Sequence, residues 1–258
     1  MRTGAYRQPG FTLIELMISV VIGMTLILVA GNMYVGSVRS SASIAGETDL
    51  RETSYYLLLT LQQHLNQAGF RAIKPFNVLQ AGSFPVPAKD SFFVAVEGEW
   101  AQGQYVKADG QTLAIRFGGA TTDSAKPDSS MVDCSGTTVA YDDVETLEFS
   151  VANNQLTCTT ASSSEVLAGD SGGTIVEGSA VRLGIDDNED RSADRFVGGD
   201  AASEQDFLST VSIEMRLLLA SEDRVTTTRQ DYVFNGENFT ATDRRSRAEI
   251  IIYVALKN

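Results

Sequence analysis

The sequence predicts an α+β protein in which one long N-terminal helix precedes an antiparallel β-rich domain. An apolar stretch from Phe11 to about Val38 is long enough to cross a membrane as a helix. From Glu47 onward, leucines recur at three- and four-residue spacing, which is typical of a helix with one buried face. After Pro75 the chain changes to short β-type runs separated by polar turns. A helix followed by strands favours an α+β fold with an antiparallel sheet.

The apolar stretch has the features of a membrane anchor. At ~1.5 Å per residue, about twenty helical residues span a hydrocarbon core about 30 Å thick. The preceding segment carries Arg2 and Arg7 and no acid, so the positive-inside rule keeps it cytoplasmic and sends the C-terminal bulk outward. A secretory signal has a shorter apolar region closed by a small-residue cleavage site, and no such site follows here. A plain signal anchor fits the same topology.

The second part of the helix is expected to pack on the domain that follows. Its apolar stripe consists of Leu50, Leu57, Leu58, Leu61, Leu65 and Ala68. Gly69 stands where a C-cap glycine ends a helix, and Pro75 prevents its resumption. Gly31, Gly36 and the run 40–43 lower helix propensity between the two parts, so a bend or a locally melted segment is expected there.

The remaining chain reads as one β-rich domain without an internal repeat or a long linker. Alternation of Leu113, Ile115 and Phe117 predicts a half-buried antiparallel strand. Asn153 and Asn154 form a tight-turn pair suited to a hairpin. Residues 118–131 and 159–173 are rich in Gly, Ser, Thr and Asp and are expected to be surface loops. The predicted strands are Phe92–Val96, Thr112–Phe117, Thr137–Tyr141, Glu145–Val151, Gln155–Thr159, Ala180–Ile185, Thr210–Leu219, Arg224–Phe234 and Glu249–Leu256.

Composition narrows the class of protein. With 43% hydrophobic and 21% charged residues the chain has the mix of a globular protein. A formal net charge of −13 argues against a nucleic-acid partner, because phosphate binding requires clustered Lys and Arg. The two cysteines, Cys134 and Cys158, form a disulfide if this part is exported, whereas a cytosolic chain would keep two unpaired thiols. A disulfide would close a loop of about 25 residues and contribute roughly 3–4 kcal/mol.

Glu15 distinguishes this segment from a plain signal anchor. An acid inside an apolar run costs about 2.5–3.5 kcal/mol on insertion scales, so such acids are usually paired and functional. The sequence Gly10-Phe11-Thr12-Leu13-Ile14-Glu15-Leu16 closely resembles the prepilin peptidase motif of type IV pilins and type II secretion pseudopilins. The resemblance implies cleavage after Gly10, N-methylation of Phe11 and retention of the apolar helix. It also implies that Glu15 pairs with the N-terminal amine of a neighbouring subunit during assembly.

The pilin resemblance defines an expected fold and domain plan. The fold is a type IV pilin-like fold, in which the long N-terminal helix, with a transmembrane half and an amphipathic half, packs on an antiparallel β-sheet domain. The expected parts are a cytoplasmic leader at 1–10, a transmembrane and filament-core segment at 11–38, an amphipathic segment at 39–69 and a periplasmic β-rich domain at 70–258. The protein would reside in the bacterial inner membrane as a single-pass protein and then enter a pilus.

The globular part is similar to PilW-type minor pilins. This resemblance implies a low-abundance subunit that primes pilus assembly and supports a tip complex. Expected partners are other minor pilins, the major pilin, prepilin peptidase and the inner membrane, with a tip adhesin as a further candidate. A GspJ-like pseudopilin of type II secretion shares every N-terminal feature and is the alternative. The similarity rests on Leu-x-Ile-Arg-Phe at 113–117, Asp-Cys-Ser-Gly at 133–136, Leu-Thr-Cys at 156–158, Ile-Val-Glu-Gly at 175–178, the acidic stretch 186–194 with Asp-Arg-Phe at 194–196, Asp-Arg-Arg at 243–245 and the ending at 254–258.

Residues 169–173, Gly-Asp-Ser-Gly-Gly, reproduce the nucleophile motif of serine proteases. A catalytic triad also needs a base, and the sole histidine is His64 on the predicted helix, without a local histidine motif. A solvated or core-edge position is the expected environment of His64. We therefore expect no enzyme activity and interpret the motif as a turn, with a membrane-anchored serine hydrolase as the remote alternative.

An acidic segment offers a candidate cation site. Asp186, Asn188, Asp190 and Asp194 repeat the oxygen spacing of calcium loops. Arg191 stands where such loops carry glycine, and Val197 occupies the place of the bidentate glutamate. The alternatives are a calcium loop and a solvated acidic turn. No other cofactor is expected.

Overall fold

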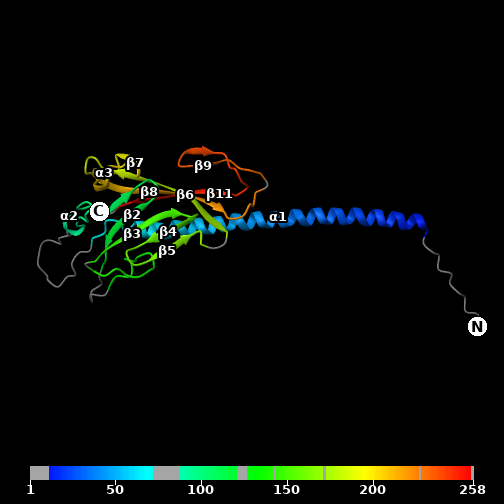
Figure 1. Ribbon diagram of the computed structural model, residues 1–258, viewed down its shortest axis with the longest axis horizontal. Coiled ribbons are helices and arrows are strands. Elements are labelled where there is room, and N and C mark those ends of the chain that lie inside the picture. Colours follow the sequence, from blue (N-terminus) through cyan, green and yellow to red (C-terminus); the bar gives the residue numbers. More distant parts are fainter. Residues whose placement is uncertain are drawn as a thin grey trace, which may run out of the picture. The chain divides into compact units, whose positions relative to one another are not determined.

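The computed structural model describes residues 12–71, 88–120, 127–141, 143–170, 173–226 and 228–256. The chain divides into two compact units, Met1–Ala45 and Gly46–Asn258. Helix α1, Leu13–Leu65, contributes to both units. In the described part of the second unit, two larger antiparallel sheets and a small hairpin accompany the last turns of α1 (Figure 1). The predicted plan of a long N-terminal helix and an antiparallel β-rich domain is confirmed.

Helix α1 has no interruption between Leu13 and Leu65. The bend or melted segment expected around Gly31, Gly36 and residues 40–43 is therefore wrong. Gly31 and Gly36 have nothing within 4 Å of the position of an added Cβ atom. Glycine lowers helix propensity by only about 1 kcal/mol relative to alanine, and the long runs of good helix formers on both sides are sufficient to carry the helix through.

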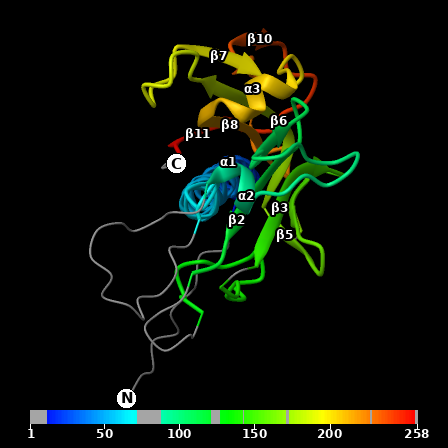
Figure 2. The same cartoon turned by 90° about the vertical axis from the view of Figure 1, so that its left-hand side faces the viewer.

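The amphipathic part of α1 supplies one wall of the core. Of the predicted stripe, Leu58 is half-buried and the other members are buried: Leu50, Leu57, Leu61, Leu65 and Ala68. Within the second unit this part of α1 lies between the two larger sheets, and all three contribute to one hydrophobic core (Figure 2). Gly69 has a φ of 74° and its N–H donates to the carbonyl of Arg116 over 2.9 Å. The predicted glycine stop is thereby confirmed.

The first sheet is an antiparallel meander of five strands in chain order. Asn153 and Asn154 join β3 to β4 with φ values of 53° and 63°, as a type I′ hairpin turn requires. The hairpin predicted from this pair is confirmed. The strands are β1, Val106–Ala108; β2, Leu113–Gly118; β3, Val144–Ala152; β4, Gln155–Thr159; and β5, Ser164–Ala168.

The second sheet has four strands in the order β11-β8-β6-β7. Its central strands are β6 (Thr174–Ile185) and β8 (Thr210–Ser221). Strand β6 is longer than predicted, since it begins six residues before Ala180. The edges of the sheet are β7 (Arg195–Gly198) and β11 (Arg247–Ala255). A separate hairpin joins β9 (Tyr232–Phe234) to β10 (Glu237–Phe239), and two short helices complete the described elements: α2, Lys89–Phe92, and α3, Glu204–Leu208.

Three predicted strands are wrong in whole or in part. Phe92 ends helix α2, and Val96 forms only an isolated bridge with Trp100. Thr137–Tyr141 contains one bridge, between Thr138 and Val132. Of the residues described within Arg224–Phe234, which leave out 227, only Tyr232–Phe234 are in a strand. These runs have β-type residues, but a β-strand also needs a neighbouring strand that accepts its hydrogen bonds.

Strands β5 and β2 also differ from the prediction. Strand β5 lies inside the predicted surface loop 159–173, because it pairs with β4. Strand β2 is buried on both faces, so it is not half-buried as expected. Arg116 is only 5% exposed, and its guanidinium lies 5.3 Å from the centre of the Trp100 ring and 5.6 Å from that of Phe93. The aromatic rings cover the face that alternation assigned to solvent.

Candidate assembly site on the N-terminal helix

The first turn of α1 holds Glu15 by hydrogen bonds within the chain. Thr12 stands directly before the first helical residue, and its N–H and its hydroxyl both donate to Oε2 of Glu15 over 2.9 Å. The N–H of Glu15 lies 3.4 Å from Oγ1 of Thr12 and completes a reciprocal capping box. Because the sequence Thr-x-x-Glu is a known helix start signal, this role could have been predicted from residues 12–15 alone.

Hydroxyl groups farther along the apolar helix are also satisfied internally. Oγ of Ser19 donates to the carbonyl of Glu15 over 2.7 Å, and Oγ1 of Thr25 donates to that of Ile22 over 2.8 Å. Such bonds are the usual solution for polar groups where water is absent. The hydroxyl groups of Ser19 and Thr25 therefore need no partner outside the helix.

The apolar side chains of this helix face outward. Met33, Tyr34 and Ile27 are more than 70% exposed, and the other large apolar side chains between Leu13 and Val38 are 46–76% exposed. Among the described residues, α1 is the one helix that is long and apolar enough to cross a membrane, by length and composition. A surface of this kind is covered by lipid or by other protein in its working environment. Gly10 and Phe11, the predicted cleavage and methylation residues, lie outside the described residues.

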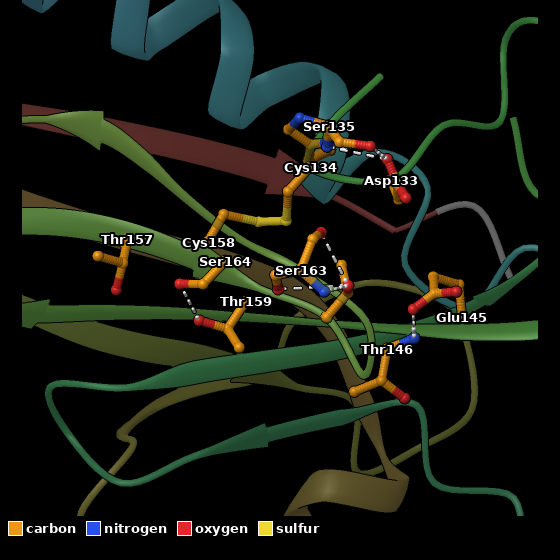
Figure 3. The surroundings of a disulfide bond; sticks show 12 residues. Asp133, Cys134, Ser135, Glu145, Thr146, Thr157, Cys158, Thr159, Ser163 and Ser164 are labelled. Atoms are coloured by element: carbon orange, nitrogen blue, oxygen red, sulfur yellow. Dashed lines mark hydrogen bonds between the residues drawn. A yellow bond between two sulfur atoms is a disulfide. The ribbon is translucent and has the colours of Figure 1, made fainter. Parts of the chain in front are cut away.

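The predicted disulfide between Cys134 and Cys158 is present (Figure 3). Their Cα atoms are 5.9 Å apart. Cys158 is fully buried on β4, whereas Cys134 lies between Val132 and Thr138, which form an isolated β-bridge. Oδ1 of Asp133 accepts hydrogen bonds from the N–H groups of Ser135 and Thr137, over 2.8 and 2.9 Å. The disulfide and this turn together attach the segment to the five-stranded sheet.

The acidic turn after β6 is organised around one carboxylate. Asp186 is 8% exposed and accepts hydrogen bonds from the N–H groups of Asn188, Glu189, Asp190 and Arg191. Burial alone would raise the pKa of Asp186, but the four N–H donors outweigh it and hold the pKa below its usual value.

The other predicted ligands of the turn are engaged locally. Asp194 accepts from the N–H of Asp187 over 2.9 Å and from the amide of Asn188 over 3.2 Å. Asp190 accepts from the N–H of Ser192 over 2.8 Å. Within the described residues, no group of three or more His, Cys, Asp or Glu side chains is arranged to hold a metal. Calcium binding at Asp186, Asn188, Asp190 and Asp194 stays a prediction.

His64 has the environment of a core residue. It is 5% exposed, its ring centre lies 6.2 Å from that of Phe149, and Nδ1 lies 3.3 Å from the amide nitrogen of Gln67. Burial lowers the pKa of His64 below its usual value. Ser171 lies outside the described residues. Among the described residues, His64 packs against Phe149 and hydrogen-bonds with Gln67.

An ion-pair cluster near β7 was not predicted from the sequence. Arg195, at the start of β7, donates to Asp187 over 2.8 Å and also to Asp206 in helix α3. Ser203 caps α3 and donates its N–H to Asp206 over 2.8 Å. Hydrogen bonds from Ser203 and from Arg195 lower the pKa of Asp206 to about 2. The sequence signal was Ser203 with Asp206 three residues later, which is the capping-box spacing.

Comparison with known proteins supports the interpretation of the N-terminus. Residues 6–31 match the family described as the prokaryotic N-terminal methylation motif. The motif with its apolar helix fits an inner-membrane anchor. Among solved structures, the chain is similar to a type IV-like pilin from Thermus thermophilus, with 15% identity, a TM-score of 0.41, and coverage of 81% of this chain and 96% of that one. Comparison with curated proteins gives no match.

Proposed function

We propose that this protein is a PilW-type minor pilin that takes part in priming, assembly and tip-complex formation of a type IV pilus. The observation that carries the proposal is the methylation motif at residues 6–31, whose later part is the start of the exposed apolar helix α1. Prepilin peptidase would cleave after Gly10 and methylate Phe11. The helix would anchor the subunit in the inner membrane, with the β-rich domain in the periplasm, until the subunit enters the pilus.

The mechanism is association of helices and has no chemical step after processing. A carboxylate in an apolar environment needs partners, and Thr12 provides two donors to Glu15 in the single chain. In the filament, the amine of Phe11 from a neighbouring subunit would add a positive charge that Thr12 lacks. A charged donor forms a stronger hydrogen bond with a carboxylate than a neutral one does. Pairing of Glu15 with this amine would therefore stabilise the assembled filament relative to the single subunit.

The globular unit supports the more specific assignment to the PilW type. Three of the motifs that resemble PilW-type proteins, at 133–136, 156–158 and 194–196, have structural roles. Cys134 and Cys158 form a disulfide, and Arg195 links Asp187 to Asp206. Asp243 accepts hydrogen bonds from Arg247 over 2.7 and 2.9 Å. These contacts stabilise the surfaces that would meet other minor pilins and the major pilin.

Deletion of the gene in the native bacterium tests the proposal. A minor pilin that primes assembly predicts a loss of surface pili, restored by the wild-type gene, with protein secretion unchanged. Co-isolation of the tagged protein with pilins from membranes and from sheared pili should give the minor pilins. Normal piliation together with a loss of protein secretion would contradict the proposal and identify a GspJ-like pseudopilin.

A further inference from the structure

Strand β11 forms one edge of the four-stranded sheet, and its nine residues pair with β8 in one unbroken register. The N–H of Ser221 donates to the carbonyl of Ser246 over 2.9 Å just before the strand. The N–H of Leu256 donates to the carbonyl of Val211 over 2.8 Å just after it. Because residues in an antiparallel pair alternate between bonded and non-bonded positions, the even-numbered residues of β11 bond to β8.

The odd-numbered residues of β11 therefore direct their N–H and C=O groups away from β8. These are Ile251, Tyr253 and Ala255 in the later part of the strand. In the described chain, no other backbone hydrogen bond is made by these three residues. The earlier part of β11 is approached by the β9–β10 hairpin, since the N–H of Asn235 donates to Glu249 over 2.9 Å. The free edge is thus residues 251–255.

This edge differs from the other sheet edges in the described residues. Strand β1 has three residues and β7 has four, and β5 has five residues with a register shift against β4. Short strands, bulges, prolines and lysines are the usual devices that prevent a sheet edge from pairing with another chain. Between Arg247 and Ala255, strand β11 has no lysine, proline or register shift. Its edge is therefore open to pairing.

On the outer face beside this edge, Ile251 and Tyr253 lie opposite Arg216 and Glu214 of β8. Arg216 forms ion pairs with Glu214 and Glu249, so the exposed apolar side chains border a set of paired charges. Ile251 is 45% exposed and Tyr253 is 49% exposed. The ring of Phe196, from β7, lies 3.1 Å from the position that a Cβ atom on Gly184 would take, and its centre lies 6.4 Å from that of the Tyr253 ring. A strand added at the edge would place alternate side chains against Ile251 and Tyr253.

We infer that the edge at residues 251–255 binds an extended segment of a different polypeptide chain by β-strand addition. The unpaired N–H and C=O groups favour an extended partner, because an added strand presents complementary groups at the same spacing. The net charge of −13 opposes pairing of two copies. The partner segment has apolar residues at every second position, facing Ile251 and Tyr253. This inference concerns the globular unit and does not depend on processing at Gly10.

Amide hydrogen exchange of the full chain in detergent tests the inference. The probe is an eight-residue peptide of alternating threonine and valine with a lysine at each end. Without the peptide, the amides of Ile251, Tyr253 and Ala255 should exchange fast while those of Ile250, Ile252 and Val254 exchange slowly. Added peptide should slow exchange at the three odd-numbered residues at least tenfold, in a saturable manner.

Two variants of Ala255 provide the controls. Ala255→Pro removes an outward N–H without removing a bond to β8, and it should weaken peptide binding at least tenfold. Ala255→Ser keeps the N–H and should bind as the wild type does. Slow exchange at Ile252 and Val254 shows that each variant is folded. The inference is overturned if the peptide protects no odd-numbered amide, if Ala255→Pro binds normally, or if raising the protein concentration alone gives the protection, which would identify a second copy as the occupant.

Discussion

The N–H and the hydroxyl of Thr12 both donate to the same carboxylate oxygen of Glu15, each over 2.9 Å. Glu15 therefore has partners within its own chain before any other subunit is present. Because a capping box contributes about 1 kcal/mol, this arrangement stabilises the first turn of α1 only modestly. A charged amine from a neighbouring subunit is a stronger partner for the carboxylate.

The proposed function predicts that charge at Glu15 is essential for assembly. Glu15→Gln keeps the shape of the side chain and can still accept from Thr12, but it has no negative charge for an amine. We expect at least tenfold less of this variant in sheared pili, with unchanged amounts in the membrane, measured by immunoblotting of both fractions. Thr12→Val is the matched control, and it should assemble nearly normally. Equal incorporation of Glu15→Gln and wild type would show that the charge has no role.

The disulfide is expected to be a main source of stability in the globular unit. It joins residues 24 positions apart, and the segment around Cys134 has little strand pairing of its own. Replacing Cys134 and Cys158 together by serine should lower the free energy of unfolding by roughly 3–4 kcal/mol. Denaturant unfolding of the full chain in detergent measures the loss. Reduction of the wild type should give the same loss, and an unchanged midpoint in either experiment would refute this account.

Asp206 predicts a loss of stability at low pH. Hydrogen bonds from Ser203 and Arg195 lower its pKa in the folded protein from 3.8 to about 2. As pH falls below about 4, the unfolded chain binds this proton before the folded chain does, so unfolding becomes more favourable until about pH 2. Asp206→Asn should remove this part of the pH dependence. Denaturation midpoints measured at several pH values provide the test, and identical slopes for both proteins would contradict the assignment.

The turn around Asp186 is expected to depend on its carboxylate without any cation. Asp186→Ala removes the acceptor of four backbone N–H groups, whereas Asp190→Ala removes the acceptor of one. Thermal unfolding in a chelator should therefore show a larger destabilisation for Asp186→Ala. A calcium site would instead show stabilisation of the wild type by millimolar calcium that both variants lose. Equal stability of wild type and Asp186→Ala in the chelator would contradict the structural role.

The features that local sequence determines were predicted well. The leucine stripe from Leu50 to Leu65 follows from helical spacing, and Asn153-Asn154 supplies the two positive φ angles of a tight hairpin. The cysteine pair was also predicted, although its pairing depended on the expectation of export. The leucines and the asparagines lie close together in sequence, and two cysteines can form only one intramolecular disulfide.

The features that depend on distant partners were missed. Strand β5 has the composition of a loop, and it is a strand because β4 lies beside it. Alternation predicts that Arg116 faces solvent, but Trp100 and Phe93 cover it. The free edge of β11 could not be recognised before the order of the strands was known. Alternation predicts which way side chains point and does not identify which element covers them.

Mass spectrometry of the mature N-terminus, on protein purified from cells with prepilin peptidase, tests the central claim most directly. The expected mature chain begins at Phe11 and carries one N-methyl group. Replacing Gly10 by alanine should leave the leader attached and serves as the control. A wild-type chain that keeps residues 1–10, or that is cleaved after the apolar segment, would contradict the account.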